Sequence, residues 1–178
     1  MEQVILLSYP RSGNTWCRYI LERCFGIRTF GYNGKIDIAP LLYTLEGFTN
    51  YRNDICVIKR HNRIENFTGR EKLILICRDK KDAIKRQMQD SNDSYNAESH
   101  LYDLNTQEYD MWVGNKIIIM YDNLLNNTMG VIKQLSTFLE KEPKLGNFEK
   151  NIEQHRDNAL KLYCEIGNNK SLTYKKNI

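Results

Sequence analysis

Residues that could hold an anion gather in one short stretch, "SYPRSGNTW", which spans residues 8–16. It places an arginine, a glycine and several small polar side chains between an apolar run and a helical pattern. Backbone N–H groups at the beginning of a helix have no partner within the helix, and the helix dipole adds positive potential there. These groups together favour phosphate binding by five neighbouring residues: Arg11, Ser12, Gly13, Asn14 and Thr15.

Two alternatives remain open for this stretch. It is not a Walker A loop, G-x-x-x-x-G-K-[ST], because the first glycine and the lysine are both missing. A strand-to-helix turn capped by a serine would need no ligand at all. Trp16 could stack on a nucleobase, or it could pack against the sheet as an ordinary core residue.

The elements that must position this stretch are buried strands and the helices between them. Four short runs are rich in Ile, Val or Leu, at residues 3–8, 55–59, 72–77 and 116–121. Such runs are typical of strands buried on both faces of a parallel sheet. Helical patterns lie between and after them, at residues 14–26, 80–90 and 129–141. The sequence therefore predicts an α/β fold, a parallel sheet with helices on both faces, whose ligand lies beyond the carboxyl ends of the strands.

The remaining segments are less regular, and we expect one domain over residues 1–178. Residues 26–53 have weak periodicity and indicate a loop with a short helix. The polar residues 90–110 indicate a mobile insertion or a surface helix, and residues 170–178 a flexible basic tail.

Composition excludes several classes of protein. The formal net charge of +4 suits a phosphorylated ligand, but the basic residues are too scattered to predict nucleic-acid binding. The five cysteines are an odd number without a C-x-x-C pair, which indicates reduced thiols and a cytoplasmic protein. No apolar run reaches the length of about 18 residues that a membrane span needs. The three histidines lie far apart, so we expect no metal site.

The stretch at residues 8–16 resembles a known loop. It matches every position of Y-P-[KR]-S-G-[TN]-T-W, the phosphosulfate-binding loop of the sulfotransferases that use 3'-phosphoadenosine 5'-phosphosulfate (PAPS). This resemblance implies a P-loop-NTPase-like sulfotransferase fold, with PAPS as sulfuryl donor and adenosine 3',5'-bisphosphate (PAP) as product. It also implies that further family motifs follow the later strands.

Two such motifs are present. The run at 55–59 leads into "KRH", which resembles the family's K-x-H, so the resemblance implies a charge-stabilising Lys59 and a general base at His61. A neutral imidazole can accept a proton near pH 7, although a surface histidine in a basic loop is the alternative. "CRDKKD" resembles the family's 3'-phosphate motif, and Arg78 and Asp82 match it. An arginine suits that role because its planar fork makes two aligned hydrogen bonds to a phosphate.

The chain departs from the family at two further places. Arg86 stands where family members commonly carry a serine; it could hold the 3'-phosphate, or it could lie on a solvated face of charged residues. The family's R-K-G segment near the C-terminus has no counterpart.

One more motif follows the last apolar run. "MYDNL" resembles the family's Y-E-D-L, which would bring Tyr121 near the adenine opposite Trp16, although packing of Tyr121 on the core is an alternative.

The resemblance implies in-line transfer of a sulfuryl group from PAPS to a hydroxyl or amine. Arg11 and Lys59 would stabilise charge on the leaving oxygen, and His61 would activate the acceptor. The acceptor stays open among small molecules, glycans, lipids and peptides. Two alternatives are a phosphonucleotide-binding module without turnover and a small nucleotide kinase, which the missing Walker lysine argues against.

Overall fold

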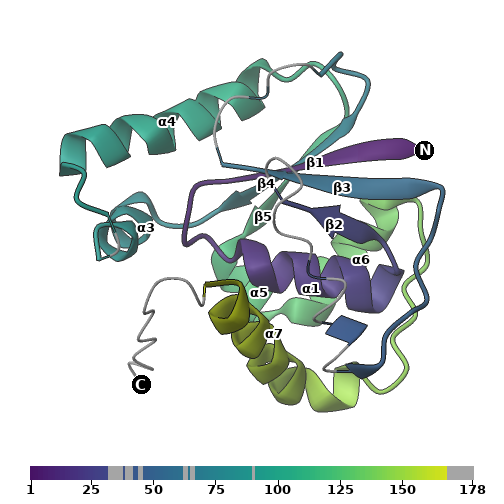
Figure 1. Ribbon diagram of the computed structural model, residues 1–178. Helices are drawn as coiled ribbons and strands as arrows, with labels where there is room; N and C mark the ends of the chain where they lie inside the picture. Colours follow the sequence, from purple (N-terminus) through teal and green to yellow (C-terminus); the bar gives the residue numbers. More distant parts are fainter. Residues whose placement is uncertain are drawn as a thin grey trace.

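The computed structural model describes residues 1–31, 38, 42–43, 46–61, 64, 67–89 and 91–167. Five strands form one parallel sheet in the order β2-β3-β1-β4-β5 (Figure 1). Their bounds are β1 Glu2–Ser8, β2 Arg28–Phe30, β3 Ile55–Arg60, β4 Lys72–Cys77 and β5 Lys116–Met120. All the strands therefore end at the same edge of the sheet, where the loops that follow β1, β3 and β4 meet.

Helices cover both faces of this sheet. In Figure 1, α4 lies on one face with α3 beside it, whereas α1, α5, α6 and α7 lie on the other. Their bounds are α1 Asn14–Phe25, α3 Lys80–Gln87, α4 Tyr95–Met111, α5 Tyr121–Asn126, α6 Thr128–Leu139 and α7 Ile152–Gly167, with a short 3-10 turn, η2, at Glu149–Asn151. The α/β class and the parallel sheet expected from the sequence are confirmed.

The central strand β1 shows why the sheet is buried on both sides. Its residues Val4, Ile5, Leu6 and Leu7 are all 0% exposed. Because side chains alternate along a strand, Val4 and Leu6 pack in the core beneath α1 and α6, while Ile5 and Leu7 face Tyr109 and Trp112 at the end of α4. A strand that is covered on both faces has a continuous run of apolar residues, and this run allowed β1 to be predicted from the sequence.

Three segments differ from what the sequence alone predicts. The stretch 26–53 contains a short edge strand, β2, paired with β3. The last run ends at Met120, and Tyr121 begins α5 instead of closing the strand. The C-terminal helix α7 has no counterpart among the expected elements. The tail at residues 170–178 lies outside the described residues.

The insertion at residues 90–110 is largely an ordered surface helix. α4 spans 17 residues, and the Ser94 hydroxyl caps its beginning by accepting the Ala97 N–H at 3.3 Å. Across the described part of the chain, no helix combines the length and apolar character needed to cross a bilayer.

Candidate functional site

The loop between β1 and α1 has a backbone that few residues can adopt. Gly13 precedes the helix with φ at 90°, and a Cβ added there would lie 2.7 Å from Cδ2 of Tyr121. Glycine is therefore required at this position both by the backbone and by the close approach of the tyrosine ring. No side chain caps the beginning of α1, so its first N–H groups face the loop without a capping acceptor.

Buried polar atoms in and beside this loop have no hydrogen-bond partner among the described residues. They are Oγ of Ser12, which is 0% exposed, Oδ1 of Asn14 and Nε of Arg78. The other amide atom of Asn14, Nδ2, donates to Ser8 Oγ at 3.0 Å and fixes the orientation of that side chain. Burying a polar atom without a partner costs free energy, so these atoms are suited to receive hydrogen bonds to or from a ligand.

Arg78 links this loop to the ends of β4 and β5. It is 7% exposed, and its Nη1 donates to the backbone oxygen of Arg11 at 3.0 Å. Its guanidinium carbon lies 4.1 Å from the centre of the Tyr121 ring, and Nη2 lies 3.6 Å from Asp82 Oδ2. Four residues that the sequence singled out, Arg11, Gly13, Arg78 and Tyr121, therefore form one connected group.

His61 lies at the same edge, just past the end of β3. Its Nδ1 lies 2.7 Å from the backbone oxygen of Ser8, the last residue of β1. A carbonyl oxygen can only accept, so Nδ1 carries the proton and Nε2 is left with its lone pair. Burial, followed by the positive charge of Lys59, lowers the pKa of His61 to about 4, so the imidazole is neutral at pH 7.

The side chain of Lys59 experiences a similar environment. Burial, followed by the positive charge of Arg18, lowers the pKa of Lys59 to about 8. Arg18 is 1% exposed on α1, one helical turn after Asn14, and donates to Thr29 Oγ1 at 2.8 Å and to Thr29 O at 2.9 Å. A cluster of cations therefore backs this edge of the sheet, and an anionic ligand would relieve their mutual repulsion.

The remaining predicted site residues are positioned differently. Trp16 is 8% exposed, donates to the Leu124 oxygen at 3.0 Å and stacks with Tyr19 and Phe148. Its ring thus packs as a core residue, and the adenine role stays a prediction. Thr15 is half-buried at the first turn of α1, and Arg86 is exposed in the last turn of α3.

Several residues at this edge were not singled out from the sequence. Asn105 of α4 donates to the backbone oxygen of His61 at 2.7 Å, and Tyr9 donates to the buried carboxylate of Glu98 at 2.5 Å. Tyr163 of α7 accepts a hydrogen bond from Nη1 of Arg11. Asn105, Glu98 and Tyr163 come from helices that are distant in sequence, and no local motif marks them.

Metal ligands do not gather in the described part of the chain. No group of three or more His, Cys, Asp or Glu side chains there could hold a metal ion. The charges that the site offers to a ligand come from its arginines and from Lys59.

Comparisons with known proteins agree with this architecture. A WSCD family member from Aedes aegypti is 25% identical over an alignment of 161 residues, which covers 78% of this chain and 50% of that protein. The chain thus spans about half the length of the curated relative it matches. Mouse sulfotransferase SULT7A1, whose crystal structure is complexed with PAP, superimposes with a TM-score of 0.54 at 18% identity, over 97% of this chain and 67% of that one. This likeness confirms the expected sulfotransferase fold.

The family model described as "Sulfotransferase domain" matches residues 1–166 of the 178. That match includes all the motifs at the carboxyl edge of the sheet. The chain therefore belongs to the sulfotransferase family.

Proposed function

We propose that this chain binds PAPS at the carboxyl edge of its sheet and transfers the sulfuryl group to a hydroxyl or amine. One observation carries the proposal: the fully buried Ser12 hydroxyl has no partner among the described residues, at the uncapped beginning of a 12-residue helix beside two arginines. Such a loop is suited to a phosphate or phosphosulfate group. Family membership and the PAP in the mouse sulfotransferase structure support the same donor.

Different residues of the site suit the 5'-phosphosulfate end and the 3'-phosphate end of PAPS. We assign the 5'-phosphosulfate end to Ser12, Gly13, Asn14 and Thr15, whose N–H groups and side chains surround the beginning of α1. Arg78 is assigned to the 3'-phosphate, with the exposed Arg86 as a second candidate. Tyr121 is the aromatic surface that we assign to the adenine, with Trp16, which packs in the core, as a second candidate.

The chemistry of transfer follows from this assignment. PAPS supplies an activated sulfuryl group: an acceptor oxygen or nitrogen forms a bond to sulfur, the bond from sulfur to the bridging oxygen breaks, and its electron pair stays on the 5'-phosphate of PAP. Arg11 and Lys59 stabilise the negative charge that grows on that oxygen. The acceptor's proton goes to Nε2 of His61.

Two features prepare His61 for this role. The bond from its Nδ1–H to the Ser8 oxygen leaves Nε2 as the only ring atom able to accept a proton. Its pKa of about 4 keeps the ring neutral before the substrates bind. An anionic donor beside the ring raises this pKa again, which strengthens the base when it is needed.

A binding module without turnover is the second candidate. It is favoured by Arg86, which stands where family members commonly carry a serine and is exposed in the last turn of α3. This candidate keeps PAP binding but predicts no transfer by the wild-type chain to any acceptor.

Replacing His61 with asparagine separates binding from chemistry. Asparagine can still donate to the Ser8 oxygen but cannot take a proton, so we expect sulfuryl transfer to fall by about 100-fold or more while the Kd for PAP changes by about twofold or less. Transfer is measured with sulfur-labelled PAPS and a broad acceptor panel, and the Kd by calorimetry. His100→Asn, an exposed position of α4, is the matched control. Undiminished transfer by His61→Asn would reject His61 as the base.

A further inference from the structure

The end of α7 lies against the loop that holds Arg11. Nη1 of Arg11 donates to the hydroxyl of Tyr163, a residue 152 positions further along the chain. The guanidinium carbon also lies 5.3 Å from the centre of the Tyr163 ring. Tyr163 therefore holds Arg11 both by a hydrogen bond and by attraction between the cation and the ring.

The backbone directs the Arg11 side chain toward α7. Arg11 has φ at 65°, a left-handed conformation that is unfavourable for a residue with a Cβ. The hydrogen bond from Arg78 to the Arg11 oxygen, at 3.0 Å, stabilises this conformation. The position of the guanidinium therefore depends on Arg78 at one end of the residue and on Tyr163 at the other.

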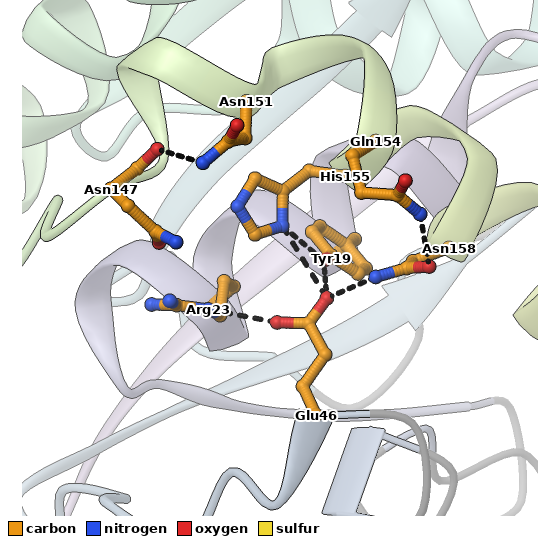
Figure 2. Close-up of polar contacts among 8 residues, drawn as sticks. All are labelled: Tyr19, Arg23, Glu46, Asn147, Asn151, Gln154, His155 and Asn158. Carbon is orange, nitrogen blue, oxygen red and sulfur yellow. Dashed lines mark hydrogen bonds and ion pairs between the residues drawn. The ribbon is translucent and has the colours of Figure 1, made fainter.

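Tyr163 is in turn held by a firmly anchored helix. The preceding residue of α7, Leu162, is 0% exposed, and Ala159 is 4% exposed in the same core. Two turns earlier, α7 joins a polar cluster around Glu46, which we call the Glu46 cluster (Figure 2). There Tyr19 and Arg23 of α1 and Asn158 of α7 donate to the Glu46 carboxylate, beside His155.

We propose that Tyr163 is a positioning residue for Arg11 in the donor site. Its hydroxyl holds the guanidinium beside the loop, where a sulfuryl or phosphate oxygen can reach it. A guanidinium has five N–H donors, so the bond to Tyr163 is compatible with bonds to an anion. This role rests on the proposed function, because it concerns the same donor, and it makes α7 a third wall of that site beside the loops after β1 and β4.

A double-mutant cycle on PAP binding tests this role. Tyr163→Phe removes only the hydroxyl, and we expect it to raise the Kd for PAP about three- to tenfold, the fold-change that corresponds to the net contribution of one ordinary hydrogen bond. In an Arg11→Met background the same change is expected to alter the Kd by less than about 1.5-fold, because the residue through which Tyr163 acts is gone. Calorimetry gives the Kd of each variant, and melting temperatures confirm that each is folded.

Tyr95→Phe, at an exposed tyrosine of α4, is the matched control and leaves the Kd unchanged. An equal effect of Tyr163→Phe in both backgrounds, or no effect in either, would overturn the role of Tyr163 while the proposed function stands. Failure of the wild-type chain to bind PAP would overturn the proposed function and this inference with it.

Discussion

His61 and Lys59 show how one physical cause acts on two residues to which we assign different roles. Burial lowers the pKa of both, to about 4 for His61 and about 8 for Lys59. For the histidine the result is a neutral ring with a lone pair on Nε2, as a base requires. For the lysine the result is a cation that is present at pH 7 but is lost as the pH rises through about 8.

This difference predicts an alkaline limit to donor binding. Because Lys59 is neutral above its pKa of about 8, the Kd for PAP should rise between pH 8 and pH 10 in the wild-type chain. In Lys59→Arg the guanidinium stays charged over this range, so the rise should move above pH 10 or disappear. Calorimetric titrations at several pH values from 7 to 10 measure both curves. Identical curves for the two proteins would exclude Lys59 as the titrating group.

At the scale of elements, the sequence predicted the strands more readily than α7, the helix that we propose as part of the site. Lys59, His61 and Arg78 follow buried apolar strands, and parallel strands bring their carboxyl ends together, so their meeting could be predicted. Tyr163 lies in a helix without a distinguishing motif, and only its contact with Arg11 marks it. The strand β2 has three residues, too few for a periodic pattern to appear.

The Glu46 cluster joins α1 to α7. We therefore expect the free energy of unfolding to depend on the hydrogen bonds of this cluster. Burial alone would raise the pKa of Glu46, but hydrogen bonds from Tyr19 and Asn158, together with the nearby His155 and Arg23, hold it below its ordinary value. A lowered carboxyl pKa contributes stability at neutral pH that is lost as the pH falls through the folded-state value. The cluster therefore stabilises the docking of α7 at neutral pH, and this stabilisation is lost when acid protonates the carboxylate.

Removing the Glu46 carboxylate should therefore destabilise the fold. Glu46→Ala leaves the donors of Tyr19, Arg23 and Asn158 without their acceptor, so we expect a loss of about 2–3 kcal/mol at pH 7. The matched control is Glu153→Ala on α7, where an exposed pair with Arg156 should contribute less than about 1 kcal/mol. Urea unfolding curves measure both. A loss for Glu46→Ala no larger than for Glu153→Ala would show that the cluster does not anchor α7.

At the scale of the whole molecule, the strand order explains how distant motifs make one site. β1 lies at the centre of the sheet, with β3 on one side and β4 on the other, so the chain passes from one side of β1 to the other between them. The loop after β1 therefore lies between His61 and Arg78. Open parallel sheets bind their ligands at such a position, where the order of the strands reverses.

A melting scan with three nucleotides tests the central claim most directly. A ligand that binds only the folded chain raises its melting temperature, and PAP at about 100 times its Kd should raise it by roughly 5–10 °C. AMP lacks the 3'-phosphate assigned to Arg78, and ATP with magnesium lacks it as well, so at equal concentrations both should raise it by far less. An equal shift from all three nucleotides, or the largest shift from ATP with magnesium, would contradict the assignment of PAPS as donor.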